Sequence, residues 1–218
     1  MVEKYTTIYE DHEAEIVEKK SRFIAVIKHV ETEEEVKSVL DAFRKKYWDA
    51  NHHVFAYTIG LKQPYERCSD DGEPSGTAGM PVLEVIRGHA LRNVMVMVTR
   101  YFGGTLLGTG GLVRAYGGST KEAIATAAIV ENILYYCMDI KVDYTLSGKV
   151  QYELLQEDYT IHHTAYLDQV VYKVLVDYPR HEAFVKKMMD LTSGVVEIVD
   201  HGLCYGEHGD GEITLHDI

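Results

Sequence analysis

The stretch LRNVMVMVTRYFGGTLLGTGGLVRAYGG, residues 91–118, joins an apolar run to a glycine-rich loop and then to a helical pattern. Residues 91–101 are apolar enough to form a buried strand. Beyond the loop, small and apolar residues recur at helical spacing, namely Leu112, Ala115, Ala123, Ile124 and Ala127. This pattern is typical of a long helix packed closely on a sheet. The stretch therefore predicts an α+β fold.

The segments before this stretch predict further elements of the same domain. A β-hairpin is expected over residues 16–30. Thr32 and Glu35 form a capping-box pattern at the start of an amphipathic helix. The next expected elements are a strand, a loop and a helix, at residues 52–60, 62–77 and 77–88. We expect this first domain to cover residues 1–134.

From residue 135 the pattern of strands and helices starts again. Strands are expected over residues 135–146, 160–166, 169–178 and 195–205, and helices over residues 149–157 and 179–192. The order strand, helix, strand, strand, helix, strand predicts a ferredoxin-like βαββαβ domain over residues 135–218.

The net charge of −12 is distributed unevenly between the two expected domains. Residues 1–134 carry 16 Lys and Arg against 19 Asp and Glu, whereas residues 135–218 carry 6 against 15. Because the phosphate backbone of a nucleic acid is repelled by an acidic surface, the second domain is a poor candidate for unassisted nucleic-acid binding. A local basic patch in the first domain stays open.

Export and disulfide signals are missing from the sequence. Residues 1–20 are charged throughout and contain no apolar signal core, and the apolar runs are shorter than a membrane span. Three widely spaced cysteines, Cys68, Cys137 and Cys204, predict neither a disulfide framework nor a four-thiolate zinc site. We therefore expect a cytoplasmic protein in a reducing compartment, with no membrane as partner.

The glycine-rich loop is the first candidate binding segment. Glycines before a helix leave backbone N–H groups open to a ligand, at the end of the helix where its dipole favours an anion. The loop glycines are Gly103, Gly104, Gly108, Gly110 and Gly111. Arg100 and Arg114 flank the loop and could clamp a phosphate or a carboxylate, and Tyr101 adjoins them.

A purely structural role for these glycines is the alternative. The loop matches no Walker pattern and no complete dinucleotide fingerprint, and glycine most often serves turns and close packing. Gly117 and Gly118 lie inside the expected helix, where glycine is unfavourable by roughly 1 kcal/mol relative to alanine. They predict that another segment of backbone approaches the helix there.

The segment SDDGEPSGTAGMP, residues 69–81, is the second candidate binding segment. Its carboxylates Asp70, Asp71 and Glu73 repel one another unless a positive group lies among them. A divalent cation, the arginines of the glycine-rich segment, or solvent alone could each supply the compensation. Ser75 belongs to the same candidate site, although it could instead cap the following helix.

Two histidines open the strand at residues 52–60, and successive side chains of a strand point to opposite faces. At most one of them can enter a given site, and His53 is the one we include in the candidate site. The C-terminal His201, Cys204 and His208 offer only three ligands, whereas a structural zinc needs four, so we predict no metal site. The sequence contains no recognisable catalytic triad, and it does not indicate which cofactor, if any, would bind.

Four motifs give the chain a specific resemblance to the YigZ/IMPACT family, in its bacterial two-domain branch. These motifs are KKSRFIA (19–25), HHVFAY (52–57), SDDGEPSGTAGMPVL (69–83) and VTRYFGGTLLGTGGLVRAY (98–116). The resemblance implies a first domain similar to the second domain of small-subunit ribosomal protein five. It also implies a second domain resembling the last domain of elongation factor G.

The same resemblance implies a link to translational control. The eukaryotic member of the family competes for the activator of an amino-acid-starvation kinase. That member has an N-terminal RWD-type domain, which we do not expect in this chain. Partner competition of that kind is therefore not carried over. The acidic net charge also departs from what unaided RNA binding favours.

Three functional hypotheses follow. The first is a binding protein that docks on RNA or a ribosome-associated partner through its N-terminal domain. The second is an enzyme or nucleotide-binding protein acting on a phosphorylated small molecule, and the third is a protein-interaction adaptor. All three hypotheses use the same two segments, and steep salt dependence would distinguish RNA binding from a preformed small-ligand pocket.

Overall fold

The computed structural model describes residues 1–209 and 211–218. The chain divides into two compact units, Met1–Glu131 and Asn132–Ile218. The domain boundary expected after residue 134 lies inside the strand β7, Ile129–Val142, which continues without a break across the division. Within the described residues, no helix is long and apolar enough to cross a membrane.

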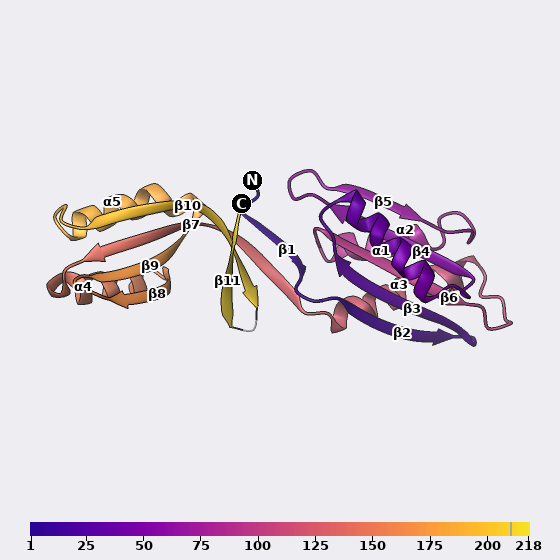
Figure 1. Ribbon diagram of the computed structural model, residues 1–218. Helices are drawn as coiled ribbons and strands as arrows, with labels where there is room; N and C mark the ends of the chain where they lie inside the picture. The colour runs from indigo at the N-terminus through magenta and orange to yellow at the C-terminus, as the bar shows by residue number, and fades with distance from the viewer. Residues whose placement is uncertain (210) are drawn as a thin grey trace. The chain divides into compact units, whose positions relative to one another are not determined.

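The N-terminal unit is built on a five-stranded antiparallel sheet in the order β2-β3-β6-β4-β5 (Figure 1). The strands of this sheet are β2 (His12–Glu18), β3 (Ser21–His29), β4 (His52–Ile59), β5 (Tyr65–Ser69) and β6 (Val94–Tyr101), and β1 (Lys4–Ile8) lies outside it. Its helices are α1 (Glu33–Lys46), α2 (Gly79–Gly88) and α3 (Thr109–Thr126). The buried strand predicted over residues 91–101 is present as the central strand β6, which begins three residues later, at Val94.

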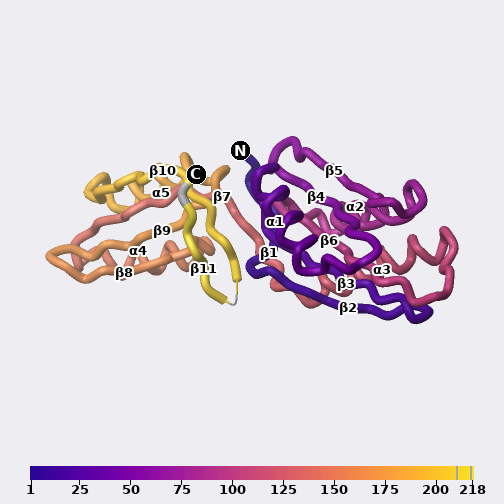
Figure 2. Tube along the Cα trace, turned by 45° about the vertical axis from the view of Figure 1, so that its right-hand side comes forward, coloured from indigo at the N-terminus to yellow at the C-terminus, as the bar shows by residue number. Residues whose placement is uncertain are grey.

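Helices cover both faces of this sheet. Successive side chains of a strand point to opposite faces, and in this sheet apolar side chains point to both. Val94, Val96 and Val98 of β6 pack with residues of α2 and α3. Met95 and Met97 of the same strand pack with residues of α1 on the other face. Figures 1 and 2 show α1 on the opposite side of the sheet from α2 and α3.

The capping box predicted for α1 is present. Thr32 Oγ1 accepts from the Glu35 N–H at 3.2 Å, and Glu35 Oε2 accepts from the Glu31 N–H at 2.7 Å. Two unpaired donors at the helix start are thereby satisfied, and three glutamates in the first turn suit the positive end of the helix dipole. The helix therefore begins where local sequence signals place it.

Two predictions for this unit are wrong. Residues 62–77 do not form one continuous loop, because residues 65–69 form the edge strand β5 beside β4. Gly117 and Gly118 meet no neighbouring backbone: a Cβ there would touch only the side chains of Val85, at 3.9 Å, and Ile16, at 3.7 Å. Close backbone approach occurs instead outside this helix, at Gly79 and Gly103.

The C-terminal unit has the predicted order of strand, helix, strand, strand, helix, strand, followed by one further strand. After β7 come α4 (Tyr144–Gln156), β8 (Thr160–Tyr166), β9 (Val170–Asp177), a short 3₁₀ turn η1 (Tyr178–Arg180), α5 (His181–Leu191), β10 (Glu197–Gly209) and β11 (Glu212–Asp217). The sheet order is β11-β10-β7-β9-β8. Residues of α4 and α5 pack with one face of this sheet in a single apolar cluster.

A disulfide joins Cys137 of β7 to Cys204 of β10, with the Cα atoms 6.6 Å apart. The prediction that these cysteines form no disulfide is therefore wrong. The two residues are 67 positions apart in sequence, but β7 and β10 are neighbours in the sheet. Sequence spacing could not reveal this neighbourhood, since disulfide formation depends on the distance between Cβ atoms in the fold. Cys68 is free.

Candidate functional site

The segment between β5 and α2 folds around the carboxylate of Asp70. Asp70 Oδ2 accepts from the Gly76 N–H at 2.8 Å, and Oδ1 accepts from the N–H groups of Ala78 at 3.0 Å and Gly79 at 2.8 Å. Burial alone would raise the pKa of Asp70, but these three hydrogen bonds together outweigh it, so the pKa lies below its ordinary value. Asp70 therefore caps the start of α2.

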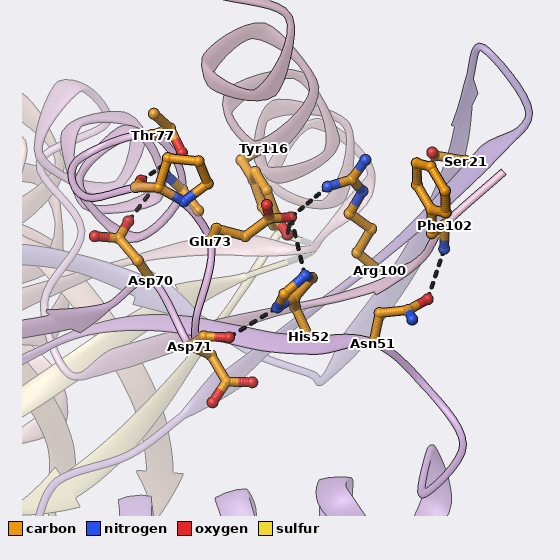
Figure 3. A network of polar contacts seen from close by, with 12 residues as sticks. Ser21, Asn51, His52, Asp70, Asp71, Glu73, Thr77, Arg100, Phe102 and Tyr116 are labelled. Atoms are coloured by element: carbon orange, nitrogen blue, oxygen red, sulfur yellow. Dashed lines mark hydrogen bonds and ion pairs between the residues drawn. The ribbon is translucent and has the colours of Figure 1, made fainter. Parts of the chain in front are cut away.

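Asp71 also serves the fold of the loop. Its Oδ2 accepts from the backbone N–H of His53 at 2.6 Å, and its Oδ1 lies 3.9 Å from Arg44. Its carbonyl oxygen accepts from Nδ1 of His52 at 2.8 Å. Figure 3 shows the Asp71 carboxylate pointing away from Glu73. The three carboxylates of this segment therefore do not converge on one point.

Glu73 is the centre of a buried polar network (Figure 3). Its Oε1 accepts from Arg100 Nη1 at 2.6 Å and from the Tyr116 hydroxyl at 2.8 Å, and it lies 3.8 Å from His52 Nε2. The side chains of Glu73 and Arg100 are only 4% and 6% exposed. Burial, followed by the charge of Glu73, raises the pKa of Tyr116, which thus stays a hydrogen-bond donor.

Arg100 is held between two aromatic rings. Its Cζ lies 5.4 Å from the ring centre of Phe23 in the core and 5.6 Å from that of Phe102. Phe102 is 46% exposed, so one face of this arrangement is open to solvent. The Nε of Arg100 is buried and has no hydrogen-bond partner among the described residues. The cation is thus fixed by the sheet, by Glu73 and by both rings.

A cavity of about 500 Å³ lies beside this network. It is lined by Asn51, His52, Glu73, Pro74, Arg100, Phe102, Leu106, Leu107, Gly108, Thr109 and Leu112. Polar groups come from the start of β4, the acidic segment and the end of β6, whereas the leucines come from the glycine-rich loop and α3. The cavity therefore combines one polar wall with one apolar wall, which is the usual make-up of a small-ligand pocket.

The glycine-rich loop shapes the mouth of this cavity. Gly104 and Gly108 adopt positive φ angles of 80° and 71°. Gly103 lies so close to the backbone of Lys20 and Ser21 that a Cβ would collide with them. These three positions therefore require glycine for the path of the chain itself.

The helix α3 begins beside the cavity without a side-chain cap, with Gly108 as its N-cap residue. The first N–H groups of a helix have no partner within it. A Cβ added at Gly110 would lie 3.6 Å from the Arg114 guanidinium. A Cβ added at Gly111 would lie 3.0 Å from the Leu107 side chain. The start of α3 is thus open on the side of Gly108 and Thr109, which both line the cavity.

The remaining predicted site residues lie away from the cavity. Ser75 is exposed and forms no hydrogen bond among the described residues. The Tyr101 hydroxyl donates to Asp49 at 2.9 Å. His53 Nδ1 lies 3.3 Å from Thr99 Oγ1, and burial lowers the pKa of His53.

The structure therefore brings Glu73, Arg100 and Gly108 together and separates them from His53, Asp70 and Asp71. The predicted site left out five important members, which are Asn51, His52, Phe102, Leu106 and Tyr116, and His52 rather than His53 is the histidine that lines the cavity. The alternation of β4 restricted the choice to one histidine, but it carried no signal for which face meets the cavity.

Metal binding at the acidic segment finds no support in this arrangement. Within the part of the chain that the structure describes, no group of three or more His, Cys, Asp and Glu side chains is placed to hold a metal ion. The carboxylates of Asp70 and Asp71 are already engaged by backbone N–H groups, and Glu73 is engaged by Arg100.

The fold has two units, and motifs of the first unit form the cavity. Each unit matches the model of a known domain family. Residues 19–124 match the Impact N-terminal domain, and residues 140–195 match a domain of unknown function, DUF1949.

The chain belongs to the IMPACT family. It is 40% identical over 207 residues to the IMPACT family member YvyE of Bacillus subtilis, covering 95% of both chains. It is 32% identical over 183 residues to the IMPACT family member YigZ of Escherichia coli, covering 83% of this chain and 90% of that one. A crystal structure of a hypothetical protein aligns with 91% of this chain and 98% of its own, at 30% identity and a TM-score of 0.60.

Proposed function

We propose that this chain is a translation-linked regulatory protein whose N-terminal unit binds single-stranded RNA at the mouth of the cavity. The observation that carries the proposal is a group of cations around the loop of residues 102–110. Lys19, Lys20 and Arg114 are exposed and form no ion pair among the described residues. A protein with a net charge of −12 that keeps such cations beside one loop has a local site for phosphate groups.

Two of these three residues contact the loop, and Lys19 directly precedes Lys20 in the chain. The Lys20 backbone abuts Gly103, and the Arg114 guanidinium lies near Gly110. The loop itself presents Phe102, 46% exposed, and Leu106, 83% exposed. Exposed aromatic side chains beside cations suit single-stranded nucleic acid, because bases stack on the rings while the cations follow the backbone.

Binding of fluorescently labelled single-stranded RNA, measured by anisotropy across a salt series, tests this proposal. We expect the affinity to fall steeply with salt and the salt slope to decrease by roughly 0.7 for each lost phosphate contact. The variant Lys19→Ala/Lys20→Ala and the variant Arg114→Ala should each weaken binding and reduce the slope.

Lys37→Ala is the matched control, because Lys37 is also exposed and unpaired among the described residues but belongs to α1, on the other face of the sheet. Equal losses in Lys37→Ala and Arg114→Ala would contradict the proposed location. No RNA binding by the wild-type protein at low salt would overturn the proposal itself.

A phosphorylated small molecule is a second candidate ligand, favoured by the cavity of about 500 Å³ beside the open start of α3. Helix N-termini favour anions, and a preformed pocket depends much less on salt than RNA binding does. Thermal-shift measurements against nucleotides and sugar phosphates test it, because a bound ligand raises the melting temperature. A ribosome-associated protein partner, or an adaptor role without either ligand, stays a hypothesis.

We further propose that the two units resemble parts of the translation machinery and act in the cytoplasm. The order of β7, α4, β8, β9, α5 and β10 supports a ferredoxin-like unit similar to the last domain of elongation factor G. The strand β6 followed by α3 supports a first unit similar to the second domain of small-subunit ribosomal protein five. Solved structures of both units, superposed on those domains, would test each resemblance.

A further inference from the structure

The polar wall of the cavity contains the Glu73 carboxylate and the His52 imidazole as neighbours. All three close contacts of Glu73 fall on Oε1, and Oε2 forms no hydrogen bond among the described residues. His52 donates from Nδ1 to the Asp71 carbonyl, so its Nε2 is the nitrogen that accepts whenever the ring is neutral. That Nε2 lies 3.8 Å from Glu73 Oε1. A ligand that satisfies this wall must carry two neighbouring N–H donors.

Guanine is the RNA base with this pattern on its Watson–Crick edge, because its N1–H and its exocyclic N2 amino group are adjacent donors. Adenine and cytosine each place one amino donor beside a ring acceptor, and uracil has a single N–H between two carbonyls. A base without a matching donor would leave Glu73 Oε2 unpaired and cut off from water, which makes a mismatch costly. The acceptor pair therefore discriminates between bases.

The opposite wall suits the flat faces of a base. Phe102 lines the cavity and faces the Arg100 guanidinium from 5.6 Å, and Leu106 and Leu107 continue the apolar surface. Unstacked bases in single-stranded RNA are commonly held on aromatic rings while their Watson–Crick edge is hydrogen-bonded. Gly108 and Thr109 place the open start of α3 on the same cavity, where a phosphate on the ribose of the bound nucleotide would be favoured.

We infer that the cavity binds one unstacked guanine nucleotide, with its base edge on Glu73 and His52 and its base face on Phe102. The inference rests on the proposed function, since it names the nucleotide that the RNA site selects. A free guanine nucleotide has the same chemistry as a guanosine within a strand, so the two sources require separate tests.

The first test compares two labelled RNA strands that differ only by guanosine or adenosine at one central position within a uridine run. We expect the guanosine strand to bind at least about tenfold more tightly. A parallel titration measures the binding of GMP, IMP and AMP by calorimetry. IMP keeps the N1–H but lacks the N2 amino group, so its affinity should lie between those of GMP and AMP.

The outcomes separate the two proposals. Equal affinity for both strands would overturn the guanine pocket while leaving RNA binding in place. Tight and selective GMP binding without binding of either strand would support the pocket with a free nucleotide as ligand and overturn the proposed RNA function. No binding of strands or nucleotides would overturn both.

Variants test the assigned contacts. Glu73→Gln replaces an acceptor oxygen by an amide donor and should abolish the preference for guanine. Because this change also removes the negative charge that compensates buried Arg100, Phe102→Leu provides a second variant whose folding is less at risk. Phe102→Leu should weaken GMP binding at least about fivefold by loss of stacking. Tyr166→Leu is its control, since Tyr166 is an aromatic of β8 in the other unit and is also exposed, at 66%.

Unchanged GMP affinity in a folded Phe102→Leu protein would overturn the assignment of the base to this cavity. The same holds if Tyr166→Leu weakens GMP binding as much as Phe102→Leu does.

Discussion

The Arg100 guanidinium donates to Glu73 Oε1 at 2.6 Å while both side chains are almost completely buried. Arg100 belongs to the central strand β6 and Glu73 to the segment before α2, so the pair ties the cavity wall to the sheet. A pair of this kind contributes little net stability compared with apolar residues of the same size, but removing one partner leaves an uncompensated charge. The position of the Glu73–Arg100 pair in a cavity wall suits a role in ligand binding.

Removal of one partner should therefore destabilise the protein strongly. We expect Arg100→Met to lower the free energy of unfolding by about 3–5 kcal/mol, because Glu73 would stay buried without its cation. The double variant Arg100→Met/Glu73→Gln should recover part of this loss. Urea unfolding followed by circular dichroism measures both. A loss of less than about 1 kcal/mol in the single variant would show that Glu73 is not buried as a charge.

The Tyr116 hydroxyl should contribute more than an ordinary tyrosine hydroxyl, because its acceptor is the charged Glu73. Tyr116→Phe should cost about 1.5–3 kcal/mol of unfolding free energy. The matched control is Tyr172→Phe, which removes a hydroxyl that donates to the neutral Ser147 carbonyl at 3.1 Å, and which should cost about 1 kcal/mol. Equal costs for the two variants would contradict a charged Glu73.

Asp70 should make stability depend on pH. Burial alone would raise its pKa, but the N–H groups of Gly76, Gly79 and Ala78 together lower it, so folding favours the charged form. Its contribution is complete above the unfolded-state pKa of about 3.9 and is lost as pH falls through the lower folded-state pKa. Asp70→Asn should cost roughly 1 kcal/mol near neutral pH.

Unfolding free energies of wild-type and Asp70→Asn protein at about pH 7 and about pH 3 check this prediction. The difference between the two proteins should shrink at the lower pH. A difference that grows on acidification would mean that the folded state disfavours the Asp70 carboxylate.

Gly103 should not tolerate a side chain. A Cβ there would collide with the backbone of Lys20 and Ser21, and backbone atoms cannot move aside as a flexible side chain can. We expect Gly103→Ala to cost about 1–3 kcal/mol. Gly148→Ala is the control, since Gly148 lies inside α4 with no atom near the added Cβ, and it should stabilise by about 0.5–1 kcal/mol. Thermal unfolding measures both shifts.

The disulfide between Cys137 and Cys204 should leave one reactive thiol in the unfolded protein. Alkylation in denaturant without a reductant should modify Cys68 alone, and alkylation after reduction should modify all three cysteines. Reduction should also lower stability by about 2–4 kcal/mol. Mass spectrometry reads the number of alkyl groups, and three groups without a reductant would show that Cys137 and Cys204 are thiols.

The elements predicted well are those with local signals. The capping box at Thr32 and the apolar run of β6 each contain enough information within one segment to determine a helix start or a buried strand. The edge strands β1 and β5 carry no such signal, because half-exposed edge strands have mixed polar composition. Their positions depend on pairing with a neighbouring strand, which single-sequence patterns do not contain.

The candidate site was predictable as two segments and only partly as a set of residues. Compensation of the acidic segment by an arginine of the other segment was one of three open alternatives, and the Glu73–Arg100 pair selects it. The choice between His52 and His53 depended on which face of β4 meets the cavity. Tyr116 lies in an ordinary helical pattern, so nothing local distinguished its buried hydroxyl from a packing residue.

One carboxylate holds together the segment that carries Glu73 into the cavity wall. Asp70 accepts from the amides of Gly76, Ala78 and Gly79, and the same short segment carries Glu73 into its pairing with Arg100. If that segment opens as one cooperative unit, these three amide protons should exchange with deuterated water at a common rate. Their common exchange rate would then report how often this part of the cavity wall opens. A ligand bound to Glu73 should slow the exchange of all three amides by the same factor.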